Sequence, residues 1–125
     1  MLPLIGPLRP WADPEVVSIG RLPQHVPLPL GADARRSLDG QWQFTLYPHP
    51  DDVPDTAVVG PTPTTDVSVA VPGNWTVQGV GDLPHYTNVQ MPFPGPPPAL
   101  PPRNPTGVYR RSFTLGRGWR SQRVV

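Results

Sequence analysis

The sequence contains no cysteine, no lysine and a single glutamate, Glu15. The lack of cysteine excludes disulfides, thiolate metal sites and a thiol nucleophile. Long hydrophobic runs are also lacking, so no transmembrane helix is predicted. Residues 1–9 have neither the basic start nor the sustained apolar run of a signal peptide. These absences favour a soluble protein, with the cytoplasm as the expected location.

Proline and aromatic residues, by contrast, are frequent. The 125 residues include 22 prolines and 12 glycines, a content often found in disordered chains. Four tryptophans, three tyrosines and three phenylalanines are spread along the chain, however, and only 15% of the residues are charged. Disordered chains are usually poor in aromatic residues and rich in charge. We therefore expect at most one domain, with ordered strands between long proline-rich loops.

Charge is unevenly distributed, although the net charge is only +1. All nine acidic residues lie at or before Asp82, and six arginines follow: Arg103, Arg110, Arg111, Arg117, Arg120 and Arg123. A basic tail of this kind can bind nucleic acid. Because the arginines alternate with apolar, strand-like residues, we favour acidic partners beyond Val125 instead. We expect neither a nucleic-acid partner nor a membrane partner.

Residues 1–34 are predicted to form an extended N-terminal arm. Asp13 and Pro14 are typical of a helix start and Gly20 of a helix end, so a short helix is expected near residues 14–19. Regular helix is excluded after this point by three prolines, Pro23, Pro27 and Pro29. We therefore expect the rest of the arm to run extended over another surface.

Residues 35–125 are predicted to form a β-sheet domain that is truncated at its C-terminal end. Polar and apolar residues alternate over residues 41–47 and 66–71, which is the period of a half-buried strand. A third strand is predicted over residues 108–115, and a fourth begins near Arg120. With so few strands, we expect several core residues to stay partly exposed: Trp42, Phe44, Val69 and Phe113.

Two loops, residues 48–65 and 76–107, are longer than ordinary connections. Loops of this length are usually functional or disordered. Residues 92–105 contain eight prolines and are predicted to be stiff and similar to polyproline. Such a segment also suits proline-recognition domains, although the spacing they accept is common in any proline-rich sequence.

Groups that carry catalysis are not evident in the sequence. Asp51, Asp52 and Asp55 cluster in a loop, where a solvated turn is favoured over a catalytic pair. The three histidines are too widely separated for a short-range metal-ligand pattern. No serine lies in a Gly-x-Ser-x-Gly turn, and no glycine-rich loop of the dinucleotide-binding type is present. We predict no catalytic residue, no metal site and no nucleotide cofactor in this chain.

Four separated motifs follow one another in a fixed order. They are Arg36-Ser37-Leu38-Asp39-Gly40-Gln41-Trp42-Gln43-Phe44, Val71-Pro72-Gly73-Asn74-Trp75, Tyr86-Thr87-Asn88-Val89 and Asn104-Pro105-Thr106-Gly107-Val108-Tyr109-Arg110-Arg111. Together they resemble the N-terminal sugar-binding domain of bacterial β-galactosidases of glycoside hydrolase family 2. The resemblance covers essentially the whole chain. It implies an all-β fold, the first part of a jelly-roll sandwich with incomplete sheets.

The resemblance also implies a role for Asn88. In this family, the asparagine of the Tyr-Thr-Asn-Val motif reaches the active site and contacts the galactosyl group. Asn88 is the matching position and is therefore the predicted substrate-binding residue. An amide can donate and accept hydrogen bonds toward sugar hydroxyls at once. Without the resemblance, Asn88 would be interpreted as a turn residue, and Trp42 and Trp75 as core residues rather than sugar-stacking platforms.

The resemblance implies an N-terminal fragment of a β-galactosidase, an enzyme that hydrolyses terminal β-D-galactosides. Hydrolysis ordinarily needs two carboxyl groups, and the family's catalytic glutamates belong to a later barrel domain that nothing here matches. This chain alone is expected to be inactive. Implied partners are the galactoside, the remaining domains or a downstream product, and further copies of the complete enzyme, contacted by residues 9–30. The alternative is a stand-alone carbohydrate-binding or interaction module without catalysis.

Magnesium and sodium are implied by the family for the complete enzyme. Just before Trp11, however, Pro10 replaces an acid that helps to bind magnesium, and Asp13 stands where the family has an asparagine. We therefore expect this chain to bind no metal by itself.

Overall fold

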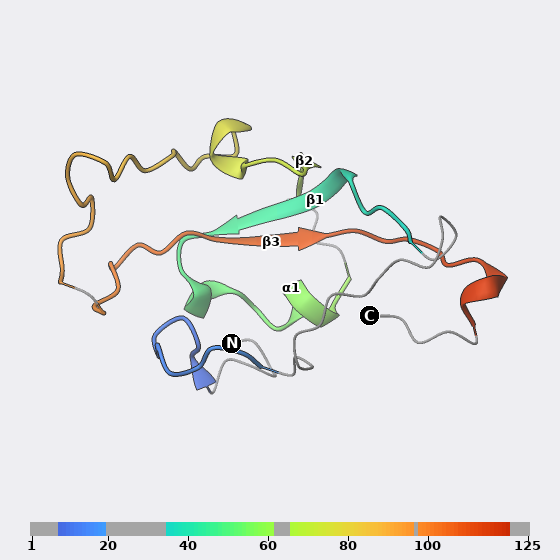
Figure 1. Cartoon of the computed structure of the whole chain (residues 1–125), viewed down its shortest axis with the longest axis horizontal. Helices are drawn as coiled ribbons and strands as arrows, with labels where there is room; N and C mark the ends of the chain where they lie inside the picture. Colours follow the sequence, from blue (N-terminus) through green and yellow to red (C-terminus); the bar gives the residue numbers. More distant parts are fainter. Residues whose placement is uncertain (1–7, 20–34, 62–65, 97, 121–125) are drawn as a thin grey trace.

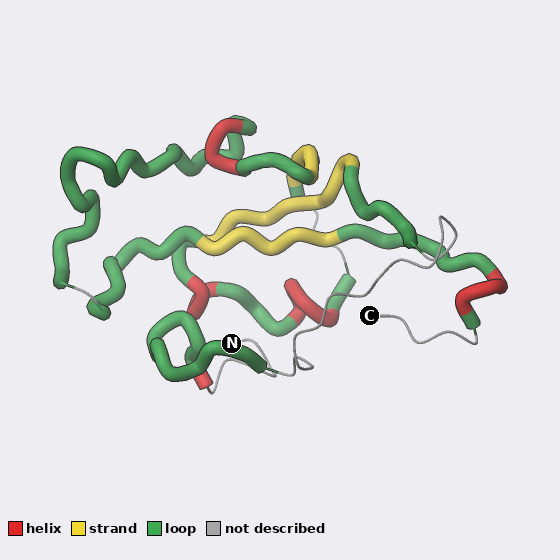
Figure 2. The backbone as a smooth tube through the Cα atoms, in the orientation of Figure 1, coloured by secondary structure: helices red, strands yellow, loops and turns green. Residues whose placement is uncertain are grey.

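A three-stranded antiparallel sheet lies at the centre of the computed structural model, which describes residues 8–19, 35–61, 66–96 and 98–120 (Figure 1). Strand β1 is Gly40–Tyr47, β2 is Val67–Val71 and β3 is Thr106–Arg110, in the order β2-β1-β3. The helical elements are short: α1 at Thr56–Val59, and 3₁₀ turns at Pro50–Asp52, Trp75–Val77 and Arg117–Trp119. Loops join these elements over most of the chain length, as Figure 2 shows. The all-β prediction is therefore confirmed.

The register of the sheet gathers its aromatic residues on one face. Trp42 lies opposite Val69 in β2, and Phe44 lies opposite Tyr109 in β3. Since residues opposite each other in an antiparallel pair project to the same face, these four side chains share one side of the sheet. The alternation predicted for β1 and β2 thus produces the expected apolar face.

Phe44 is the centre of the core. Its side chain is fully buried, and its ring lies 5.4 Å from that of Trp75 and 4.9 Å from that of Tyr109, measured between centroids. These spacings are in the range preferred by aromatic pairs. Trp75 follows β2 directly, so the segment after β2 covers the aromatic face. Gly107 of β3 permits this packing, because a Cβ there would lie 2.6 Å from Cζ3 of Trp75.

The segment with α1 is attached to the sheet at the end of β3. Val53 and Ala57 of this segment are buried. Arg110 at the end of β3 donates to the carbonyls of Ala57 and Pro61 and lies 3.8 Å from a carboxylate oxygen of Asp66. Of the loop predicted over residues 48–65, the described part, residues 48–61, is therefore attached to the sheet through Arg110.

The turn before β1 is tied to the residue that follows β3. The carbonyl of Leu38 accepts from the indole of Trp42 at 2.7 Å and from the guanidinium of Arg111 at 2.6 Å. Arg111 also donates to the carbonyl of Asp39 at 2.6 Å and lies over the ring of Trp42. Gly40 joins this turn to β1 with a φ of +126°, a conformation that favours glycine.

Three sequence predictions differ from the structure. The short helix expected near residues 14–19 is a turn, in which Val16 donates to the carbonyl of Asp13, because no further helical hydrogen bonds follow it. The third strand ends at Arg110 instead of residue 115. Phe44 and Val69 are fully buried, and Trp75 and Tyr109 pack against Phe44, whereas Phe113 is exposed as predicted.

The basic residues after Asp82 also differ from expectation. We expected their acidic partners beyond Val125, but two of them have acidic partners within the described residues and a third binds backbone carbonyls instead. Arg103 lies 3.6 Å from Asp82, Arg110 contacts Asp66, and Arg111 binds backbone carbonyls. The sheet order places β3 beside β1, so Arg111 reaches the turn before β1, while Arg103 and Asp82 meet within the loop between β2 and β3.

Other predictions concern parts of the chain outside the described residues. They are the extended path of residues 21–34 and the fourth strand near the C-terminus, most of which falls in residues 121–125. A jelly-roll sandwich also requires two sheets, whereas the residues that the structure describes form a single sheet. The jelly-roll arrangement therefore stays a prediction.

Candidate functional site

The loop between β2 and β3 extends beyond the end of the sheet at which β1 ends and β3 begins (Figure 1). It starts with the 3₁₀ turn Trp75–Val77, which Asn74 caps by accepting from the backbone N–H of Thr76 at 3.1 Å. Gln78 then returns to β2, where its side-chain amide binds both the N–H and the carbonyl of Ala70. Asn74 is therefore a structural residue that caps this turn.

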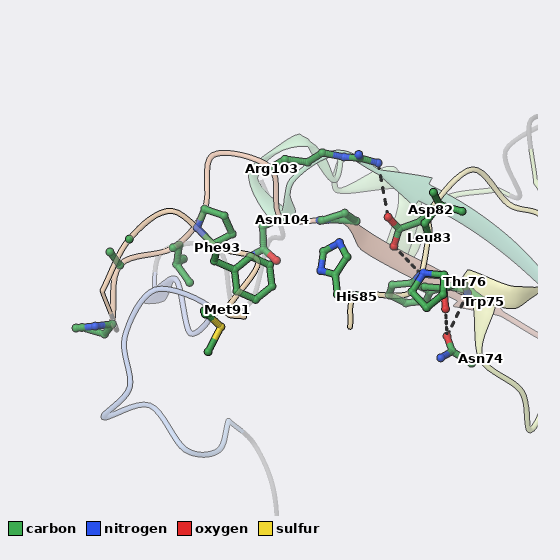
Figure 3. Close-up of a pocket in the computed structure, with 17 residues that line it drawn as sticks. Asn74, Trp75, Thr76, Asp82, Leu83, His85, Met91, Phe93, Arg103 and Asn104 are labelled. Carbon is green, nitrogen blue, oxygen red and sulfur yellow. Dashed lines mark hydrogen bonds and ion pairs between the residues drawn. The ribbon is translucent and has the colours of Figure 1, made fainter. Parts of the chain in front are cut away.

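A groove of about 650 Å³ lies between the start and the end of this loop (Figure 3). Its walls are mostly apolar, and its aromatic members include Trp75, His85 and Phe93. The rings of His85 and Phe93 meet edge to face at 5.3 Å between centroids. A concave, mostly apolar surface with a few polar groups is the usual form of a ligand site. Sequence reasoning did not identify this groove.

Asp82 is the buried polar group of the groove. Its side chain is 8% exposed, and its two carboxylate oxygens have different partners. Oδ2 accepts from the indole N–H of Trp75 at 3.0 Å, and Oδ1 lies 3.6 Å from the guanidinium of Arg103. Figure 3 shows both contacts. A signal in the sequence was available, since Asp82 is the last acid of the chain and follows a Gly-x-Gly turn.

The motif Tyr86-Thr87-Asn88-Val89 is exposed along its whole length. The side chains of Tyr86 and Val89 are 71% and 86% exposed. Asn88 donates from Nδ2 to the hydroxyl of Tyr86 at 3.0 Å. An asparagine amide has two donors and one oxygen that accepts, so this bond uses only part of its capacity. The predicted substrate-binding residue is thus accessible, and it lies outside the lining of the groove.

The other three motifs serve the scaffold instead. The first supplies β1 with Trp42 and Phe44, the second supplies Trp75, and the fourth supplies β3 with Gly107 and Tyr109. Trp42 and Trp75 pack against Tyr109 at 6.4 Å and 6.2 Å between ring centroids, which favours their interpretation as core residues. Only the third of the four motifs lies away from this packing.

The described residues do not form a metal centre. They contain no group of three or more histidine, cysteine, aspartate or glutamate side chains that could hold a metal ion. Pro10 offers no side-chain ligand, and Oδ1 of Asp13 accepts from the backbone N–H of Glu15 at 3.0 Å. The described residues therefore offer no such cluster for the magnesium that the resemblance implies. Asp51 is held by Arg9 at 2.9 Å, next to a turn capped by His49.

Among the described residues, no helix has the length and apolar character needed to cross a bilayer.

Comparison with known proteins gives consistent results. The β-galactosidase of Erwinia tasmaniensis is 38% identical over 122 residues, which cover 89% of this chain and 12% of the relative. The β-galactosidase of Yersinia enterocolitica is also 38% identical, over 89% of this chain and 11% of the relative. That of Aeromonas hydrophila is 34% identical over 95% of this chain and 13% of the relative. The chain thus spans about an eighth of the length of these curated relatives.

The match to a family profile defines the region more closely. Residues 35–125 match the family described as glycosyl hydrolases family 2, sugar binding domain. This region contains the whole sheet and the loop with Asp82, Asn88 and the groove. The chain therefore belongs to the sugar-binding domain family of the family 2 glycosyl hydrolases.

Proposed function

We propose that this chain is the galactoside-recognising part of a β-galactosidase, an enzyme that hydrolyses terminal β-D-galactosides. Its family and the activity named for its relatives support this proposal. Because the chain spans about an eighth of those relatives, we assign hydrolysis to a longer protein. In that protein, other segments supply the pair of carboxyl groups that cleavage of a glycosidic bond requires.

One observation carries the role of Asn88 in this proposal. The motif Tyr86-Thr87-Asn88-Val89 is exposed, while the other three motifs build the sheet and its aromatic core. A motif without a packing role that presents an amide to its surroundings is suited to contact a ligand. In this proposal Asn88 binds a galactosyl hydroxyl, and Tyr86 orients the amide through its hydroxyl.

Further parts of the proposal rest on the resemblance. The complete enzyme is a cytoplasmic homo-oligomer, to which residues 9–30 contribute subunit contacts. The arm ends at residue 34 and the domain starts at residue 35, and the start of the family match at residue 35 supports this boundary.

A titration of the 125-residue chain with methyl β-D-galactoside tests the role of Asn88. The side-chain amide signals of the chain are followed by NMR during the titration. We expect saturable shifts of the Asn88 signal. Asn88→Ala should weaken binding about tenfold, because the loss of one hydrogen bond to a ligand costs on the order of 1.4 kcal/mol.

Gln90→Ala is the matched control, since Gln90 is an exposed amide in the same loop. This variant should bind the galactoside as the unchanged chain does. Methyl α-D-glucoside serves as the control sugar and should give no saturable shift. Equal affinities of the Asn88→Ala variant and the unchanged chain would show that Asn88 does not recognise the sugar.

A further inference from the structure

Asp82 connects the two ends of the loop that carries Asn88. One of its oxygens binds Trp75, which is fixed to the sheet through Phe44 and Tyr109. The other oxygen faces Arg103, which lies just before β3 begins at Thr106. A single carboxylate therefore links the segment that leaves the sheet with the segment that returns to it (Figure 3).

Asp82 lies between the last attachment of the loop to a strand and the exposed residue Asn88. Before Asp82, the last side chain that holds the loop to a strand is Gln78, which binds Ala70. Tyr86 and Asn88 follow Asp82 by four and six residues and are exposed. At about 3.3–3.6 Å per extended residue, each residue added to a free segment widens the space that Asn88 can reach. A fixed Asp82 shortens the free segment before Asn88.

The burial of Asp82 strengthens its contacts with Trp75 and Arg103, because a buried carboxylate is less screened by water. Its side chain is 8% exposed, whereas that of Arg103 is 67% exposed. A buried carboxylate requires hydrogen-bonding or charged partners, and here it has one of each kind. These contacts hold the side chain of Asp82 between Trp75 and the exposed Arg103.

We propose that Asp82 is a positioning residue for galactoside recognition, which acts by holding the segment of residues 83–88 so that Asn88 faces the sugar. This inference rests on the proposed function of Asn88. Asp82 itself need not touch the galactoside. Groups that bind a ligand lose affinity when the residues that support them are displaced, even by small distances.

Asp82→Asn tests the proposal in the 125-residue chain. Asparagine keeps an oxygen that can accept from the indole of Trp75, but it loses the charge that faces Arg103. We expect the side-chain signals of Tyr86 and Asn88 to shift and broaden, while the signals of Phe44 and Val69 in the core stay unchanged. The dissociation constant for methyl β-D-galactoside should rise about tenfold. Asp39→Asn is the matched control, since Asp39 is an exposed acid in the turn before β1.

Arg103 provides a second test that does not alter a buried side chain. Arg103→Met should change the Tyr86 and Asn88 signals as Asp82→Asn does. Arg103→Lys should leave these signals unchanged, because it keeps the positive charge. Unchanged Tyr86 and Asn88 signals in both Asp82→Asn and Arg103→Met would overturn the proposal. Changes that spread equally to Phe44 and Val69 would also overturn it, because they would show a general effect on the fold.

The proposed function can fail separately from this inference. If Asn88→Ala leaves galactoside binding unchanged, Asn88 does not recognise the sugar, and Asp82 cannot position it for that purpose. If Asn88→Ala weakens binding but Asp82→Asn does not, the role of Asn88 stands and the positioning role of Asp82 is wrong.

Discussion

Gly107 is a residue whose identity is determined by its neighbours. A Cβ at this position would lie 2.5 Å from Cε2 of Phe44 and 2.6 Å from Cζ3 of Trp75. Both rings belong to the buried aromatic cluster and are packed by Tyr109 as well. Neither ring can move away from a new Cβ without disturbing its packing against the ring of Tyr109.

Gly107→Ala should therefore destabilise the chain by about 1–3 kcal/mol, the usual cost of overpacking a core. Urea unfolding followed by tryptophan fluorescence measures the change. Gly116→Ala is the control, because a Cβ at Gly116 would have no atom within 4 Å and its φ is −65°. An unchanged unfolding midpoint for Gly107→Ala would contradict the packing described for Phe44 and Trp75.

Residue chemistry predicted part of this cluster. The alternation over residues 41–47 predicted β1 and placed Trp42 and Phe44 on one face. The burial of Phe44 was predicted wrongly, because the expectation counted strands and ignored Trp75. The small number of strands was expected to leave this face open, but Trp75, from the loop after β2, packs against Phe44 there.

At the scale of elements, Arg110 holds together parts of the chain that are distant in sequence. It donates to the carbonyl of Ala57 in α1 and to that of Pro61. It also lies 3.8 Å from Asp66, whose side chain accepts from the hydroxyl of Thr45. Arg110 and Asp66 are 19% and 6% exposed at the side chain, so water screens their interaction only partly.

Arg110→Gln should loosen the segment that contains α1. We expect a loss of about 2 kcal/mol in unfolding free energy, because a partly buried carboxylate and a carbonyl lose a charged donor. Hydrogen exchange should become faster for the N–H of Gly60, which donates to the carbonyl of Thr56.

Arg117→Gln is the control for this prediction, since Arg117 is an exposed arginine in the short 3₁₀ turn after β3. It should change neither stability nor exchange. Equal exchange rates of Gly60 in the Arg110→Gln variant and the unchanged chain would show that Arg110 does not attach this segment to the sheet.

The elements also show what a sequence pattern can and cannot predict. Alternation over residues 108–115 predicted a strand that is longer than β3, which ends at Arg110. Alternation indicates that a segment has an apolar face, but a strand also requires a neighbour to pair with. The pairing with β1 ends where Gln43 lies opposite Arg110, and the side chain of Arg111 turns to the carbonyls of Leu38 and Asp39.

At the scale of the whole molecule, the distribution of carboxyl groups decides what this chain can do alone. Its one glutamate, Glu15, lies in the turn of the N-terminal segment. Asp66 and Asp82 are engaged by Arg110 and Arg103 within the fold. We predict that the 125-residue chain does not hydrolyse o-nitrophenyl β-D-galactoside above the uncatalysed rate, because a glycosidase ordinarily needs two free carboxyl groups across the bond.

A chromogenic assay with the purified chain checks this prediction. A commercial β-galactosidase serves as the positive control, and the Asn88→Ala variant serves as the negative control. Turnover that follows the chain through purification and is lost in the Asn88→Ala variant would contradict the prediction.

The candidate site could be predicted only in part. Asn88 was identified through the resemblance, because nothing in its own chemistry separates a ligand contact from a turn. The groove and Asp82 were not identified, since they depend on the return of the loop to the start of β3. Asp82 and Arg103 are 21 positions apart in the sequence, and no local sequence pattern predicts that they come into contact.

The side chain of Gln78 has a consequence for how this sheet can associate. β2 lies at the edge of the sheet that the structure describes, and an open edge is a template for pairing with another chain. The amide of Gln78 imitates a neighbouring strand, because it binds the N–H of Ala70 at 2.7 Å and the carbonyl of Ala70 at 3.1 Å. Any strand that extends the sheet past β2 must stop before Ala70 or displace Gln78, so this one amide limits the growth of the sheet into aggregates.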